Sequence, residues 1–177
     1  MYSSFDFRIN PQKVEPKIAR EYCEGRLKDI SFQEKYSAIL NNLENNRLQN
    51  IDREIKNLEN LSSSKPETLY VNGLYSYKLG DFKTSLNSYI SGIKIDPMFY
   101  GNYSALFNYY NREKIYDKAF KVMSEAEKYH YNNTDLIKNY IYFYETNNNI
   151  LLAKQYLLKY FYILNRDRIS DKDINIF

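Results

Sequence analysis

Apolar residues recur every three or four positions along most of the chain, and this is the spacing of amphipathic α-helices. The clearest break between two such stretches is Gly80-Asp81. Glycine adopts the left-handed conformation that ends many helices, and aspartate caps the first turn of the following helix. Asp96-Pro97 ends the second stretch, because proline disfavours a helical conformation in the residue before it. The pattern therefore predicts a helical hairpin over residues 66–99.

This pattern returns after 34 residues, and again after another 34. Small residues occupy the positions at which the two helices of a hairpin would touch: Ser85, Ala119 and Ala153. Large apolar residues occupy the positions at which neighbouring hairpins would meet: Phe82, Tyr116 and Ile150. The sequence therefore predicts three consecutive hairpins, over residues 66–99, 100–133 and 134–167.

The turn residue differs between the three hairpins. Asn148 replaces the glycine in the third hairpin and tolerates the left-handed conformation. Lys114 stands there in the second, so either it adopts this conformation at a cost of about 1 kcal/mol or the turn has another geometry. Tyr160 is a further departure, because the first two hairpins have small residues at its position, Gly92 and Ala126.

The repeat resembles the tetratricopeptide repeat (TPR). The resemblance rests on the Gly80 turn followed by Phe82, on the closing Pro97, and on small residues in both helices: Gly73, Ser85 and Gly92. It is closest over residues 66–99 and weakest over 134–167. It implies an all-α fold, a right-handed superhelical array of antiparallel hairpins (an α-solenoid). The first helix of each hairpin would line a concave groove for a segment of another protein.

The resemblance also implies which residues face that groove. They mix tyrosine, amide and charged side chains: Tyr70, Leu74, Tyr77, Lys78, Ser104, Asn108, Asn111, Arg112, Asp135, Lys138, Tyr142 and Glu145. Tyrosine offers a large, rigid contact area with a polar tip, which suits protein recognition. The two-carboxylate clamp with which some TPR proteins hold the end of a chaperone is absent. Its positions hold other residues here: Tyr70, Leu74, Asp135 and Asn139.

The segment before the hairpins, residues 15–65, is also predicted to be helical. Residues 15–30 place their apolar side chains on one face of a helix. Residues 32–65 have two interpretations. They form either one long helix or a degenerate fourth hairpin that turns at Asn45-Asn46.

Two pairs of residues in this segment have the spacing of a capping box, in which a serine and a glutamate begin a helix. They are Ser31 with Glu34, and Ser64 with Glu67. The sequence therefore predicts that one helix begins at each serine.

The two ends of the chain differ from the helical part. Residues 1–14 alternate apolar and other side chains before Pro11, which predicts an extended arm or a loosely ordered terminus. Residues 168–177 are mostly polar, and we expect no helix there that covers the last hairpin. An uncovered last hairpin would favour self-association or binding of a partner.

Composition and charge mainly exclude certain ligands, a disulfide and certain locations of the protein. A length of 177 residues suits one domain or one domain with an appendage. A net charge of +3, without a run of like charges, disfavours binding to nucleic acid or lipid. The single cysteine, Cys23, excludes an intrachain disulfide and fits a reducing compartment. Neither a signal peptide nor a membrane-spanning stretch is recognised, so we expect a cytoplasmic protein.

Few residues are candidates for catalysis or metal binding. His130 is the single histidine and stands near a predicted helix end, while Cys23 lies on the apolar face of a predicted helix. We expect both to be structural. One histidine and one cysteine do not make a zinc site, and motifs for nucleotide binding or nucleophilic catalysis are missing. The sequence therefore predicts no catalytic residue, metal or cofactor.

These observations favour a non-catalytic protein–protein interaction module, either an adaptor or an assembly subunit. Small TPR chaperones for secreted proteins are an alternative of similar size, but they are usually acidic, whereas this chain has a charge of +3. An RNA-binding helical repeat is another, with bases stacked on tyrosines. The modest charge disfavours it, because affinity for nucleic acid depends on phosphate neutralisation.

Overall fold

The computed structural model describes residues 16–165, with side chains from residue 28 onward. These residues form eight helices and no strand, so the fold is all-α, as predicted. The predicted arm 1–14 and tail 168–177 lie outside the described residues, and so does the side chain of Cys23. The chain divides into two compact units, residues 1–63 and 64–177.

The first unit contains two packed helices, α1 (Pro16–Glu44) and α2 (Ile51–Leu61). The chain turns between them at residues 45–50, so residues 32–65 do not form one long helix. Buried apolar residues lie on both helices: Ile39, Leu43, Ile51, Ile55 and Leu58. The Asn42 amide also donates a hydrogen bond of 3.3 Å to the Glu54 carboxylate.

Both predicted capping boxes are wrong. Ser31 and Glu34 lie inside α1, where the helix continues without a break and backbone N–H groups already have helical acceptors. The next helix after α2 begins at Pro66, with Lys65 as its N-cap, rather than at Ser64. Proline suits the first helical position because its fixed φ is helical and no N–H is needed there.

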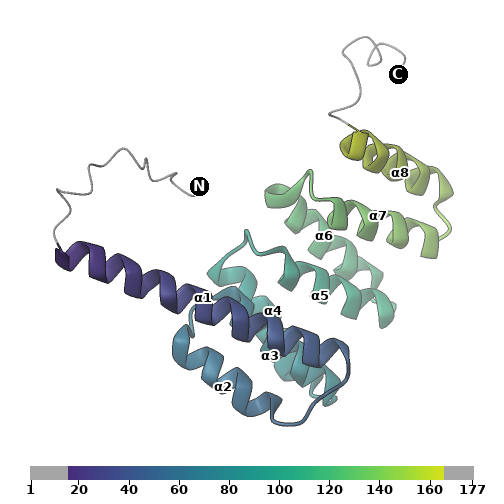
Figure 1. Cartoon of the computed structure of the whole chain (residues 1–177). Helices are drawn as coiled ribbons and strands as arrows, with labels where there is room; N and C mark the ends of the chain where they lie inside the picture. Colours follow the sequence, from purple (N-terminus) through teal and green to yellow (C-terminus); the bar gives the residue numbers. More distant parts are fainter. Residues whose placement is uncertain (1–15, 166–177) are drawn as a thin grey trace. The chain divides into compact units, whose positions relative to one another are not determined.

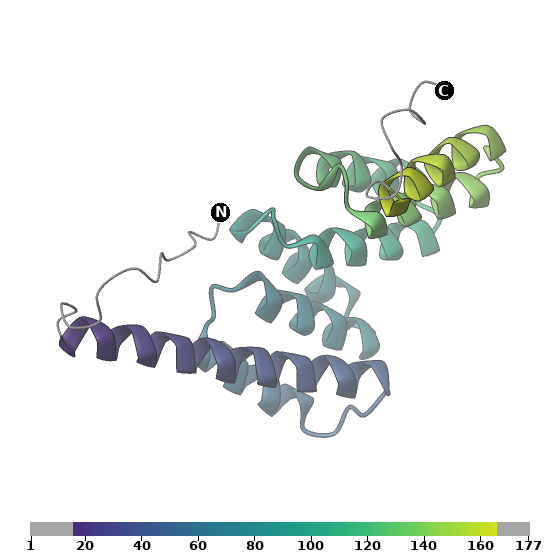
Figure 2. The same ribbon diagram turned by 45° about the horizontal axis from the view of Figure 1, so that its top comes forward.

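The described part of the second unit, up to residue 165, consists of three hairpins (Figure 1; Figure 2). Their helices are α3 (Pro66–Lys78), α4 (Phe82–Ile95), α5 (Tyr100–Arg112), α6 (Tyr116–His130), α7 (Thr134–Thr146) and α8 (Ile150–Asn165). The first helices begin at residues 66, 100 and 134, and the second helices at 82, 116 and 150. Each helix therefore begins 34 residues after its counterpart, which is the period that the sequence predicts.

The turns repeat as closely as the helices. Four residues adopt the left-handed conformation at this spacing: Asn46, Gly80, Lys114 and Asn148. At each turn this residue and the next donate backbone hydrogen bonds to carbonyls three and five positions earlier, respectively. This is the Schellman motif that ends many helices. The 34-residue period of the turns thus extends back to the hairpin of α1 and α2.

Caps and helix ends also follow the prediction in the hairpin of α3 and α4. The Asp81 carboxylate accepts a hydrogen bond of 3.0 Å from the Thr84 backbone N–H at the start of α4. Hydrogen bonds from Thr84 lower the pKa of Asp81. The last residue of α4 is Ile95, immediately before Asp96-Pro97. In the hairpin of α5 and α6 the capping position holds Ile115, whose side chain has no hydrogen-bond acceptor.

We expect Lys114→Gly to stabilise the protein by about 1 kcal/mol, because Lys114 has φ 58° and glycine adopts this conformation without steric cost. Chemical denaturation followed by circular dichroism measures the change. The control is Lys121→Gly in the exposed middle of α6, which we expect to destabilise by about 1 kcal/mol. Equal losses from both variants would contradict the prediction.

Small residues bring helices together within and between hairpins. Ser85, Ala119 and Ala153 are buried, as predicted. A β-carbon added to Gly73 would lie 2.3 Å from the Tyr89 ring, and one added to Gly92 would lie 2.3 Å from the Asn102 amide. α3 thus packs closely on α4 at Gly73, and α4 on α5 at Gly92.

Candidate functional site

The three first helices share one side of the second unit. The backbones of α3 and α5 pack together, and so do those of α5 and α7, whereas the backbones of the second helices α4, α6 and α8 lie farther apart, with Lys159 of α8 reaching Glu127 of α6. The predicted groove residues all belong to α3, α5 and α7. The first helices therefore present the adjacent surfaces on which a site can extend from one hairpin to the next.

A pocket of about 190 Å³ lies between α3 and α5. Tyr70, Leu74 and Tyr77 reach it from α3, because residues four and three positions apart share one helix face. Residues spaced by four line it from α5: Ser104, Asn108 and Arg112. Three further residues complete the lining: Tyr89, Ala105 and Tyr109.

Aromatic rings make one end of this pocket. The Tyr77 ring meets Tyr109 edge-on, with ring centroids 6.3 Å apart. The Arg112 guanidinium lies over the Tyr77 ring, 4.7 Å from its centroid, which is the geometry of a cation–π contact. Arg112 is exposed and forms no ion pair with the residues whose side chains are described. Its charge is thus accessible to an incoming carboxylate or carbonyl.

Aromatic packing also holds the other end of the pocket. Tyr70 packs edge-on against Phe99, with centroids 5.6 Å apart, and lies 6.3 Å from Tyr89. Burial raises the pKa of Tyr89 to about 12, so its phenol is neutral at physiological pH. The walls therefore combine apolar ring surfaces with hydroxyl groups, and they carry one accessible cation.

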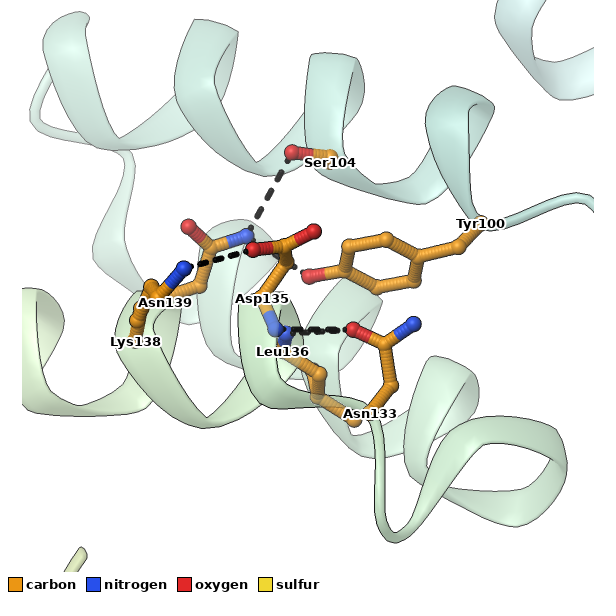
Figure 3. Close-up of polar contacts among 7 residues, drawn as sticks. All are labelled: Tyr100, Ser104, Asn133, Asp135, Leu136, Lys138 and Asn139. Atoms are coloured by element: carbon orange, nitrogen blue, oxygen red, sulfur yellow. Dashed lines mark hydrogen bonds and ion pairs between the residues drawn. The ribbon is translucent and has the colours of Figure 1, made fainter. Parts of the chain in front are cut away.

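A polar cluster connects α5 with α7 beside this pocket (Figure 3). The Asn139 amide donates hydrogen bonds to the Tyr100 hydroxyl at 2.8 Å and to the Ser104 hydroxyl at 3.5 Å. Burial raises the pKa of Tyr100, which keeps its hydroxyl protonated. Ser104 belongs to both the pocket and this cluster, so the two are continuous.

The α7 end of the cluster is held by local contacts. The Asn133 side chain accepts hydrogen bonds from the backbone N–H groups of Asp135 and Leu136, at 2.9 and 3.0 Å. Lys138 pairs with Asp135 at 3.0 Å, and this hydrogen bond raises the pKa of Lys138. Both charged side chains are more than half exposed. The pair therefore forms a polar, solvent-facing border.

The structure brings half of the predicted groove residues together in the pocket: Tyr70, Leu74, Tyr77, Ser104, Asn108 and Arg112. Five others are exposed but do not line it: Lys78, Asp135, Lys138, Tyr142 and Glu145. Asn111 is buried, with 8% exposure, so its predicted place on the open groove is wrong. Asn111 belongs to α5, which contacts a first helix on both sides.

Sequence reasoning missed residues of both the pocket and the polar cluster. Tyr109 and Ala105 follow Asn108 and Ser104 by one position, and they reach the pocket because it wraps around α5. Tyr89 enters from the second helix α4. Asn139 is four residues after Asp135 on the same face of α7, and this spacing is the signal that would have identified it.

His130 has a structural setting. Its Nε2 atom lies 3.0 Å from the Pro97 carbonyl, and its ring packs edge-on against Tyr100 and Tyr103. In the part of the chain that the structure describes, no group of three or more metal-ligating His, Cys, Asp or Glu side chains comes together. None of the helices formed by residues 16–165 has the length and apolarity needed to cross a membrane.

Comparisons with known proteins add no family assignment. The sequence matches no protein-family model, and a search of curated proteins found no similar sequence.

Proposed function

We propose that this chain is a TPR-like protein-binding module without catalytic activity. In this proposal the hairpins form a right-handed solenoid, and the surfaces of α3, α5 and α7 make its concave groove. The 34-residue period of helices and turns supports the repeat. The backbones of the first helices pack closer together than those of the second helices, and this supports the direction of curvature.

The observation that carries the proposed site is the pocket between α3 and α5. A bound segment would place one apolar side chain against the rings of Tyr77 and Tyr109, because aromatic surfaces gain most from excluding water. Its backbone or a carboxylate would meet the Asn108 amide and the Arg112 guanidinium at the rim. This division between an apolar anchor and a few orienting polar groups is typical of recognition pockets.

We expect Asn108→Trp to reduce partner binding at least tenfold, because an indole at this exposed position fills the pocket. The measurement is affinity capture of the tagged chain from its native cells, followed by titration of the captured protein. The chain has no tryptophan of its own, so the fluorescence of the introduced residue reports whether its indole ring is buried in the pocket.

The matched control is Asn87→Trp, which changes an exposed residue of the second helix α4 and should keep the partner. A partner retained equally by both variants would move the site away from the pocket. Capture of nucleic acid alone, lost with rising salt, would favour the RNA-binding alternative instead. Capture of a secreted protein before its export would favour the chaperone alternative.

A further inference from the structure

The last described helix, α8, has an apolar side that no described residue covers. Seven of its large apolar side chains are exposed: Ile150, Leu151, Leu157, Leu158, Phe161, Tyr162 and Leu164. Leu151 and Leu158 are 69% and 61% exposed, and they lie seven residues apart on one side of the helix. We call these seven residues the α8 face.

Part of this face corresponds to surface that is covered in the earlier hairpins. Tyr89 of α4 and Met123 of α6 are 2% and 1% exposed, and each of these helices packs against the first helix of the next hairpin. Leu157 occupies their position one period later, and it is 41% exposed. At Leu157 the α8 face therefore exposes a position that is buried in the two earlier hairpins.

Another hairpin does not fit on α8 in the same way. The second helices α4 and α6 have the buried small residues Gly92 and Ala126 where the next first helix approaches. The corresponding residue of α8 is Tyr160, which packs beside Lys138 of α7. A tyrosine there keeps a further first helix at a distance, so the occupant of the α8 face must approach with a different geometry.

The size of the face agrees with a dimer interface. Large apolar side chains have a surface of about 150–250 Å² each, so seven half-exposed ones present roughly 700 Å². This is above the roughly 300–600 Å² of the largest apolar patch on a typical monomer. It is close to the roughly 800 Å² that each partner buries in a standard interface.

The charges of α8 select one arrangement of two copies. Its only charged residues are Lys154 and Lys159, and Lys159 pairs with Glu127 of α6 at 3.4 Å. Lys154 lies exposed among the apolar residues of the face. In an antiparallel pair with its two-fold axis between Leu157 and Leu158, Lys154 of one copy meets Phe161 of the other, a favourable cation–π contact. A parallel pair would oppose the two Lys154 side chains.

We propose that the α8 face joins two copies of this chain in an antiparallel, two-fold symmetric dimer. The interface is isologous, since the same face is used twice, and it therefore closes without forming filaments. Because it lies on α8, it leaves the pocket between α3 and α5 available to a different partner. The dimer would hold two such pockets and could bind a repeated partner segment with increased avidity.

Sedimentation of the full chain over micromolar concentrations tests this proposal. We expect a monomer–dimer equilibrium that Leu158→Glu weakens at least tenfold. The control, Ile90→Glu on the exposed side of α4, should leave it unchanged. A monomeric wild-type chain at all concentrations would overturn the proposal, as would a dimer that Leu158→Glu leaves intact.

Disulfide crosslinking tests the antiparallel arrangement independently, in a Cys23→Ser background. Leu158→Cys should form a crosslinked dimer, because the two cysteines lie next to the two-fold axis. Leu151→Cys should not, because residue 151 faces residue 164 of the other copy, about 20 Å along the helix from the second residue 151. Adding Leu164→Cys to Leu151→Cys should restore the crosslink. Crosslinking by Leu151→Cys alone would overturn the antiparallel arrangement.

Discussion

Replacing Phe107 by alanine is expected to lower the free energy of unfolding by about 3–5 kcal/mol, which is the range for large aromatic residues in protein cores. Phe107 is 1% exposed at the centre of α5. It belongs to a buried cluster that includes Met123 of α6 and Phe143 of α7. Its ring centroid lies 6.5 Å from that of Phe143. The substitution therefore removes contacts both within a hairpin and between hairpins.

Urea denaturation followed by far-ultraviolet circular dichroism measures this loss. Tyr131→Ala is the control, because this aromatic residue is 64% exposed at the end of α6. We expect it to change the stability by less than about 0.5 kcal/mol. Similar losses in the two variants would show that burial in this cluster does not determine the stability of the hairpins.

Replacing Gly73 by alanine is expected to destabilise the protein by about 2 kcal/mol, although alanine is the better helix former. The added β-carbon would lie 2.3 Å and 2.7 Å from two carbons of the Tyr89 ring. This ring is buried and cannot move aside without disturbing the contact between α3 and α4. Overpacking of this kind costs about 1–3 kcal/mol or more, and the gain in helix propensity of about 1 kcal/mol offsets only part of it.

The clash predicts coupling between the two positions. In a double-mutant cycle, Tyr89→Leu should recover at least about 1 kcal/mol of the loss caused by Gly73→Ala. Gly80→Ala provides the control, because no neighbouring atom lies within 4 Å of the added β-carbon. It should cost about 1 kcal/mol through its φ of +82°, and Tyr89→Leu should not change that cost. Additive effects of Gly73→Ala and Tyr89→Leu would contradict a direct contact.

The same two positions show how the repeat keeps its packing while its sequence varies. One period after Gly73 and Tyr89 stand Phe107 and Met123, both buried in one cluster. In the first hairpin the larger side chain of the pair is Tyr89, on the second helix. In the second hairpin it is Phe107, on the first helix. Either arrangement fills the space between the helices, because the packing depends on the summed volume.

The sequence by itself determined the local features of this protein. It predicted the all-α class, the 34-residue period, the left-handed turn at Gly80, the Asp81 cap and the buried small residues Ser85, Ala119 and Ala153. These features depend on residues a few positions apart, or on a spacing that is visible along the chain. The capping boxes failed for local reasons as well. A serine and a glutamate at that spacing are also compatible with a helix interior, as at Ser31 and Glu34, and Pro66 rather than Ser64 begins α3.

The tertiary structure decided the features that depend on which helices meet. It buried Asn111, because α5 lies between two other first helices, and it brought Tyr89 and Tyr109 into the pocket. It also joined Asn139 to Tyr100 across 39 positions of sequence. Periodicity assigns a side chain to a face of its own helix, but it does not specify how far a neighbouring helix covers that face. That coverage depends on which helices pack together, and it exists only in the packed molecule.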